Sequence, residues 1–274
     1  AEAGLKIYLF INEYDHFTSQ ILAHKEHEGQ HQEQTLGEEH LRHFFNNIKG
    51  AAASSIARVF ITGVTPVTMY NLANVFNIST NYSLAPEFNE MVGFTEEEVR
   101  EMLAYYASVL PFRHSVDELI EVMKPWYGNY CFDNSECGMA TIYNPAMVLN
   151  FVDNYIQSNY EIPKKPCEVI PSTDHEIVRQ LIRYAKEFAH DSSIIEDIMT
   201  KGFALGYLLD IFPATSINTP DGILSLLFYL GLVTIDGTYQ GNTRFAISNE
   251  AARNQMNTLI NYGEEIIQGG KELI

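Results

Sequence analysis

Two short apolar runs and the segment between them set the pattern of the first part of the chain. Residues 5–11 (LKIYLFI) and 58–63 (RVFITG) combine β-branched and aromatic residues, which is typical of strands covered on both faces. Between them, apolar residues recur at helical spacing over residues 36–49, and Gly50 follows as a stop signal. Strand, helix and strand in this order predict a crossover between neighbouring parallel strands. We therefore expect an α/β unit with the helix lying across the two strands.

Helical periodicity replaces the strand pattern after residue 93. Thr95 followed by three glutamates is typical of a helix N-cap with acids in the first turn. Further helices are predicted over residues 116–123 and 145–155, with a turn or hairpin between them that is rich in Tyr, Gly and Asn. The cluster IPKKP at residues 162–166 indicates a boundary.

A helix followed by two strands is predicted near the end of the chain. The expected helices cover residues 174–189, 192–199, 220–230 and 249 onward, and the expected strands cover 232–235 and 244–247 around a turn at 236–242. A helix followed by a β-hairpin is the outline of a winged-helix-like unit. The helix over 220–230 contains no Lys or Arg, so we expect it to contact protein rather than DNA.

Charge and cysteine content narrow the classes of protein. Thirty-five acidic residues against 17 basic ones leave a net charge of −18 over 274 residues, which disfavours binding to nucleic-acid phosphates and to anionic membrane surfaces. The apolar runs are shorter than the roughly 20 residues that span a bilayer. Three cysteines without a CxxC pair suit a reducing compartment, and no secretory signal pattern is present. We expect a cytoplasmic protein in which Cys131 and Cys137 are ordinary thiols.

The polar residues after the first strand carry the main candidate chemistry. The strand ends in FINEYD, residues 10–15. In P-loop ATPases the strand after the phosphate-binding loop ends in Asp-Glu, where the Asp holds Mg²⁺ through water and the Glu polarises the attacking water. Here Asn12 takes the first position and Glu13 the second, and an uncharged amide predicts weak metal binding. On this hexapeptide alone, capping of the following turn is the favoured explanation.

Two further motifs are better explained without chemistry. Residues 27–31 (HEGQH) match the zinc-protease motif HExxH, but no apolar residue occurs over residues 25–35 and Gly29 weakens a helix, so we expect a solvated loop. Few basic residues accompany the aromatic cluster, so we expect core and turn residues rather than a base-stacking platform. That cluster comprises Trp126, Tyr127, Tyr130 and Tyr143.

Several blocks, in order, resemble the AAA-ATPase-like family, P-loop proteins found in many gut bacteria and some eukaryotes. The first strand and its end resemble the family's Walker B text LFIDEYD, and residues 58–64 (RVFITGV) resemble its next core strand. Further matching blocks are FNEMVGFTEEEV at 88–99, WYGNY at 126–130, YNP at 143–145 and VLNF at 148–151. Many members continue into a PD-(D/E)XK-type nuclease domain, and the residues after 247 supply no such site.

The resemblance implies roles for three residues. Glu13 would orient the attacking water, Thr62 would be the polar sensor near the γ-phosphate of ATP, and Asn12 would occupy the magnesium position, holding the metal weakly through water. Asn12 replaces the family's Asp, and Gly128-Asn129 replaces its Asp-Gly. No phosphate-binding GxxxxGK[ST] occurs in the 274 residues; in the family this loop lies upstream.

The resemblance also implies an organisation and a function. We expect a partial P-loop ATPase core over residues 1–93, a helical lid over 94–162, and a helical and winged-helix-like α+β region over 163–274. ATP and Mg²⁺ are expected to bind only with an upstream phosphate loop, so this chain alone is expected to bind neither. A half sheet leaves strand edges bare, and we expect a missing N-terminal segment or another copy of the chain to cover them. The alternative is a non-catalytic protein-interaction module, which the neutral Asn12, the absent loop and the acidic surface favour.

Overall fold

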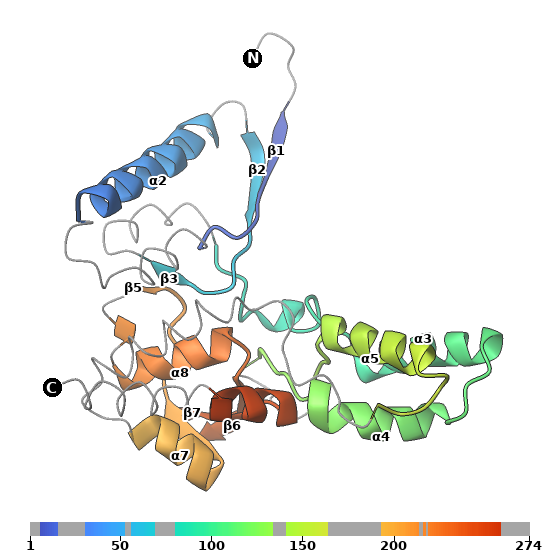
Figure 1. The fold of residues 1–274 in the computed structure, drawn as a ribbon. Coiled ribbons are helices and arrows are strands. Elements are labelled where there is room, and N and C mark those ends of the chain that lie inside the picture. The colour runs from blue at the N-terminus through green and yellow to red at the C-terminus, as the bar shows by residue number, and fades with distance from the viewer. Residues whose placement is uncertain are drawn as a thin grey trace, which may run out of the picture.

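The protein is described from a computed structural model, which covers residues 6–15, 31–52, 56–68, 80–133, 141–163, 193–213, 216–217 and 219–258. Figure 1 shows three groups of elements: strands β1 and β2 with helix α2, a lower group that contains α7, α8, β6 and β7, and an arm of helices α3, α4 and α5. Strands β3 and β5 lie between the first two groups. Within the described part of the chain, no helix is long and apolar enough to cross a membrane.

Strands β1 (Ile7–Ile11) and β2 (Ile56–Ile61) are parallel neighbours, and helix α2 (His31–Ala52) packs on one face of the pair. The expected parallel crossover is therefore confirmed. Phe45 and Ile48 of α2 are buried against strand residues that include Leu9 and Val59. The expected helix limits were too narrow, since α2 begins at His31 and continues through Gly50. Glycine costs a helix only about 1 kcal/mol, and three alanines, which are strong helix formers, follow it in the sequence.

The other face of the β1–β2 pair is exposed. Tyr8 and Phe10 of β1 are 66% and 74% exposed, and Phe60 of β2 is 50% exposed. Phe10 and Phe60 are register partners whose rings meet edge to face, with centroids 6.1 Å apart. Strands covered on both faces were expected from the apolar pattern, but the described residues cover only the α2 face. β1 pairs with no described strand other than β2.

A two-residue strand pair links this lobe to the C-terminal region. Strand β3 (Val67–Thr68) runs parallel to β5 (Phe212–Pro213), and the Phe212 amide donates to the Pro66 carbonyl oxygen at 3.4 Å. Such short bridges carry no periodic pattern, so the sequence did not predict them. As a result, the segment that leaves β2 is tied to residues almost 150 positions later in the chain.

The arm consists of α3 (Glu96–Val109), α4 (Val116–Tyr127) and α5 (Pro145–Gln157), with the 3₁₀ turn η2 (Pro86–Phe88) before it. Thr95 and Ser115 each form a capping box with the Glu three residues later, as local sequence favours. The predicted N-cap at Thr95 is confirmed. Isolated antiparallel bridges join Phe94 to Tyr143 and Tyr130 to Ile142, so the two ends of the segment between α4 and α5 lie side by side.

The C-terminal region combines α7 (Ser193–Lys201), α8 (Pro220–Tyr229) and an antiparallel sheet in the order β4-β7-β6. Its strands are β4 (Phe203–Gly206), β6 (Val233–Tyr239) and β7 (Asn242–Ile247), and residues 250–258 are helical. The expected helix-then-hairpin order is present. The turn is shorter than predicted, because two residues with positive φ, Gln240 and Gly241, reverse the chain. The helix expected over 174–189 lies outside the described residues.

Two of the interpretations made from the sequence are wrong in this part of the chain. Helix α8 was expected to contact protein partners, but its residues from Gly222 to Phe228 are buried in the core; its lack of Lys and Arg reflects burial. Cys131 is disulfide-bonded rather than an ordinary thiol, since cysteine spacing does not reveal pairing. The other two cysteines lie outside the described residues.

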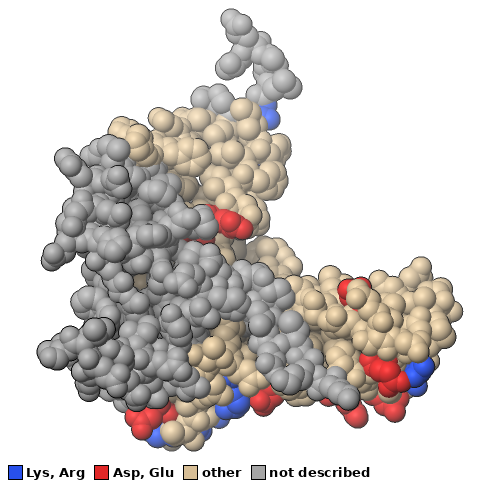
Figure 2. Space-filling view, in the orientation of Figure 1, with Lys and Arg blue, Asp and Glu red and all other residues tan. Residues whose placement is uncertain are grey.

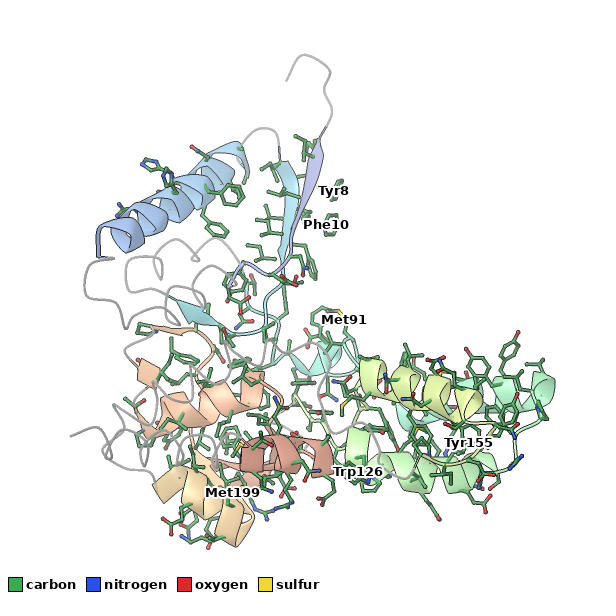
Figure 3. The ribbon with its side chains drawn as sticks, in the orientation of Figure 1. Tyr8, Phe10, Met91, Trp126, Tyr155 and Met199 are labelled. Atoms are coloured by element: carbon green, nitrogen blue, oxygen red, sulfur yellow. The ribbon has the colours of Figure 1, made fainter. Side chains whose placement is uncertain are left out.

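One continuous core joins the arm to the C-terminal region. Its buried residues come from α3, α4, α5, α7, α8 and β6, and a separate small cluster lies under α2. Tyr127, Tyr130 and Tyr143 are almost fully buried, which confirms the expectation that these aromatic residues are core residues. Figure 3 likewise shows Tyr155 among the helices of the arm.

Candidate functional site

The carboxyl ends of β1 and β2 bring three predicted site residues together. Because the two strands are parallel, the residues after each strand meet at the same edge of the sheet. The Thr62 hydroxyl donates a hydrogen bond to the Asn12 side-chain oxygen at 2.7 Å. The backbone is joined on both sides of this contact: the Thr62 amide donates to the Ile11 carbonyl at 2.8 Å, and the Tyr14 amide donates to the Thr62 carbonyl at 3.1 Å. Asn12 and Thr62, which are 50 positions apart in the chain, thus form one polar site together with Glu13; we call it the strand end.

Glu13 stands beside this contact with its carboxylate in solvent. It is exposed, and its φ of 55° lies in the left-handed region, which a residue with a side chain adopts at a conformational cost. No described residue forms a hydrogen bond or an ion pair with its carboxylate that would fix it elsewhere. The strand end therefore carries one uncommitted carboxylate next to an amide and a hydroxyl.

A second carboxylate, Asp15, is buried directly behind the strand end. It is only 3% exposed. Its oxygens accept from the Val64 amide at 3.1 Å, from the Thr65 amide at 2.6 Å and from the Thr65 hydroxyl at 3.0 Å. Sequence reasoning did not single out Asp15, although an Asp that follows a strand is a common cap for backbone amides.

Tyr14 closes the same turn from the other side. Its hydroxyl donates to the Thr65 carbonyl oxygen at 3.1 Å. Burial, and secondly the Asp15 charge, raise the pKa of the Tyr14 hydroxyl above its usual value. The phenol therefore stays protonated and remains a donor at neutral pH.

The donor set at the strand end fits a magnesium–phosphate ligand only in part. Carboxylate, amide and hydroxyl oxygens are the hard ligands that Mg²⁺ prefers, directly or through water. The Asn12 oxygen brings no charge and already accepts the Thr62 hydroxyl, so its hold on a hydrated metal is weak. Groups of three or more His, Cys, Asp or Glu that could bind a metal are absent from the described residues. Nothing here cradles a phosphate, since the sequence has no GxxxxGK[ST].

Apart from the exposed Glu13, the strand end opens on a surface with few charged residues. Figure 3 shows Tyr8 and Phe10 pointing away from α2, on the same side as Met91. In Figure 2 the surface of this lobe is mostly free of Lys, Arg, Asp and Glu, whereas acidic residues gather at the lower edge of the arm. The HExxH motif contributes nothing to this surface that can be described, because residues 27–30 lie outside the described part and only the helical backbone of His31 is included.

Comparison with known proteins identifies one family. Its model, named AAA-ATPase-like and described as a predicted AAA-ATPase, matches residues 1–73. This range contains β1, α2, β2 and all the residues of the strand-end site. No curated protein and no solved structure matches the chain. The first 73 of the 274 residues are thus similar to a predicted AAA-ATPase family.

Proposed function

We propose that this chain supplies the Walker B and sensor part of an AAA-like P-loop ATPase. The observation that carries the proposal is the 2.7 Å hydrogen bond from Thr62 to Asn12 at the carboxyl ends of adjacent parallel strands, with the exposed Glu13 beside it. A water-orienting acid, a metal position and a polar sensor need this arrangement. The family match over residues 1–73 supports the same conclusion.

Each of the three residues has one role in the proposed reaction. Glu13 orients and polarises the attacking water, and it is available for this because no described residue bonds its carboxylate. Thr62 senses the γ-phosphate through its hydroxyl. Asn12 occupies the position next to the hydrated Mg²⁺ and holds it weakly, because a neutral amide makes weaker contacts to metal-bound water than a carboxylate does.

The phosphate-binding loop must come from polypeptide other than these 274 residues, because they contain no such motif. We infer that a preceding segment, which could also carry that loop, or another copy of the chain, which could not, covers the exposed face of Tyr8, Phe10 and Phe60. Parallel sheets are normally buried on both faces, which supports this inference. The β4-β7-β6 sheet beside α8 supports a winged-helix-like C-terminal region, and the arm takes the place of a helical lid.

The test is an ATPase assay on the chain together with the polypeptide that supplies the loop. Asn12→Asp adds a negative charge at the magnesium position, so hydrolysis should rise and the Mg²⁺ concentration for half-maximal rate should fall. Adding Glu13→Gln to that variant should abolish the gain while nucleotide binding persists, because an amide keeps the shape of the side chain but cannot act as a base. Equal turnover and equal Mg²⁺ dependence in wild type and both variants would refute the site assignment.

Calorimetry on the 274-residue chain alone provides a second test. We expect no measurable heat with Mg-ATP, because the sequence has no GxxxxGK[ST] loop to hold the phosphates. Micromolar binding would mean that the nucleotide site lies elsewhere in the chain.

The competing function is a non-catalytic interaction module. The exposed aromatic face of β1 and β2 and the neutral Asn12 favour it. Asn12→Asp separates the two functions, because a degenerate ATPase gains no hydrolysis from this substitution. In an interaction module, Phe10→Ser would still weaken assembly with a protein partner.

A further inference from the structure

The carboxylate of Asp15 is placed to control the turn that follows β2. Three donors from Val64 and Thr65 converge on its two oxygens, at 2.6 to 3.1 Å. Asp15 is 3% exposed and Thr65 is 4% exposed, so water does not replace these bonds. Hydrogen bonds to a charged acceptor are roughly twice as strong as neutral ones. The turn is therefore held by an acceptor that lies 50 residues earlier, in the turn after β1.

The fit between Asp15 and the turn leaves no spare room. A Cβ added at Gly63 would lie 2.5 Å from Asp15 Oδ1 and 2.5 Å from the Tyr14 ring. Tyr14 also bonds the Thr65 carbonyl through its hydroxyl. The residues on both sides of the turn, Tyr14 and Asp15 in one strand end and residues 63–65 in the other, are thus packed as one unit.

Thr62 is the residue at which this anchor meets the candidate site. It directly precedes Gly63, and its hydroxyl donates to Asn12. The segment continues from Thr65 through Pro66 to β3, which pairs with β5 of the C-terminal region. Without an anchor, any displacement of β3 would be transmitted along four residues to Thr62. With the anchor, Val64 and Thr65 are held by Asp15, so a displacement of β3 stops before it reaches Thr62.

We propose that Asp15 is a positioning residue: its carboxylate anchors residues 63–65 so that the Thr62 hydroxyl stays beside Asn12 and Glu13. This inference rests on the proposed function of the strand end, because positioning Thr62 matters for catalysis only if the strand end is an ATPase site. It concerns a residue that touches neither nucleotide nor metal. Its effect acts through Thr62 alone.

The first experiment measures the anchor in the 274-residue chain and needs no ATPase activity. In Asp15→Ala, amide exchange at Val64 and Thr65 should quicken by about 10- to 100-fold, the equivalent of one hydrogen bond to a charged acceptor, and the Thr62 amide and methyl resonances should shift. Amides of α3 and α4 should exchange as in wild type. Asp153→Ala, which removes an exposed carboxylate bonded only to Gln157 among the described residues, is the matched control.

A more conservative pair keeps the test decisive if Asp15→Ala does not fold. Thr65→Ser retains the hydroxyl that donates to Asp15, whereas Thr65→Val removes it in the same volume. The Ser variant should match wild type, and the Val variant should move the Thr62 resonances. Asp15→Asn replaces Asp15→Ala if the alanine variant does not fold. The proposal is overturned if the Thr62 resonances and the amide exchange are unchanged both in Thr65→Val and in the Asp15 variant that folds.

The second experiment connects the anchor to turnover. With the loop-bearing polypeptide present and Asn12→Asp as background, Thr65→Val should lower kcat by about 10-fold and leave KM for ATP within about twofold, while Thr65→Ser restores kcat. A tenfold loss corresponds to the weaker end of the range for one hydrogen bond to a charged acceptor. A drop confined to KM, or equal kcat for Ser and Val, would overturn the positioning role. If the Asn12→Asp background shows no hydrolysis, the proposed function fails, and the exchange data still decide whether Asp15 anchors Thr62.

Discussion

Alanine at Gly63 is expected to destabilise the β1–β2 lobe, whereas alanine at Gly50 in the same lobe is expected to stabilise it. Both substitutions add one methyl group. They differ in what that methyl meets: at Gly63 it meets the Asp15 carboxylate and the Tyr14 ring, and at Gly50 it meets nothing within 4 Å. Neither glycine has a positive φ, so the comparison isolates packing from backbone strain.

The magnitudes follow from the distances. At Gly63 the new Cβ would lie 2.5 Å from two side-chain atoms, whereas real contacts essentially never fall below 3.0 Å, so at least 3.0 − 2.5 = 0.5 Å of movement is needed. Asp15 and Tyr14 are both held by hydrogen bonds to the turn, and overpacking of this kind costs about 1–3 kcal/mol. At Gly50, inside α2, alanine improves helix propensity by about 0.5–1 kcal/mol.

Native-state hydrogen exchange of the β1, β2 and α2 amides is the appropriate assay, because it reports opening of this lobe separately from the larger core. The two variants should differ by about 1.5–4 kcal/mol in the free energy of opening, the sum of the two effects. Equal protection in both variants, or greater protection in Gly63→Ala, would show that the close approach of Asp15 to the turn is not present in solution.

Three further results are expected. The hydrogen bond from Lys124 holds the pKa of the Glu96 carboxyl below its usual value. The stability that ionised Glu96 contributes is therefore present above its pKa in the unfolded chain and is lost as the pH falls through its pKa in the folded protein. Wild type and Glu96→Gln should differ in stability near neutral pH and converge in acid, and a constant difference would contradict this. Ser115→Ala removes one half of a capping box and should cost about 1 kcal/mol by denaturant unfolding, with no loss if the cap is unimportant. Burial raises the pKa of Tyr14, so stability should fall as the pH rises above about 10, and Tyr14→Phe should flatten that slope in an alkaline titration followed by circular dichroism.

Local features of this protein could be predicted from the sequence because their physical causes are local. The capping boxes at Thr95 and Ser115 involve residues three positions apart, and helical periodicity placed the helices that follow them. The apolar runs before Asn12 and Thr62 predicted two parallel strands, since a strand, a helix and a strand leave few other connections. The aromatic residues Tyr127 and Tyr143 could be assigned to the core from their sparse basic neighbours.

Only the tertiary structure decided which residues meet across the chain. The sequence marked Asn12 and Thr62 separately, but the bond between them depends on the register of two strands 50 residues apart. Asp15 looked like an ordinary acid until the fold buried it against Thr65. The pairing of β3 with β5 was likewise invisible, because it arises from contacts with a distant element and not from any periodic pattern. The burial of α8 was visible in its nearly all-apolar residues 223–230, since a helix that is apolar on every side is a buried helix. Sequence thus determined which segments are helices and strands, whereas the environment of each polar side chain came from the packing of segments far apart in the chain.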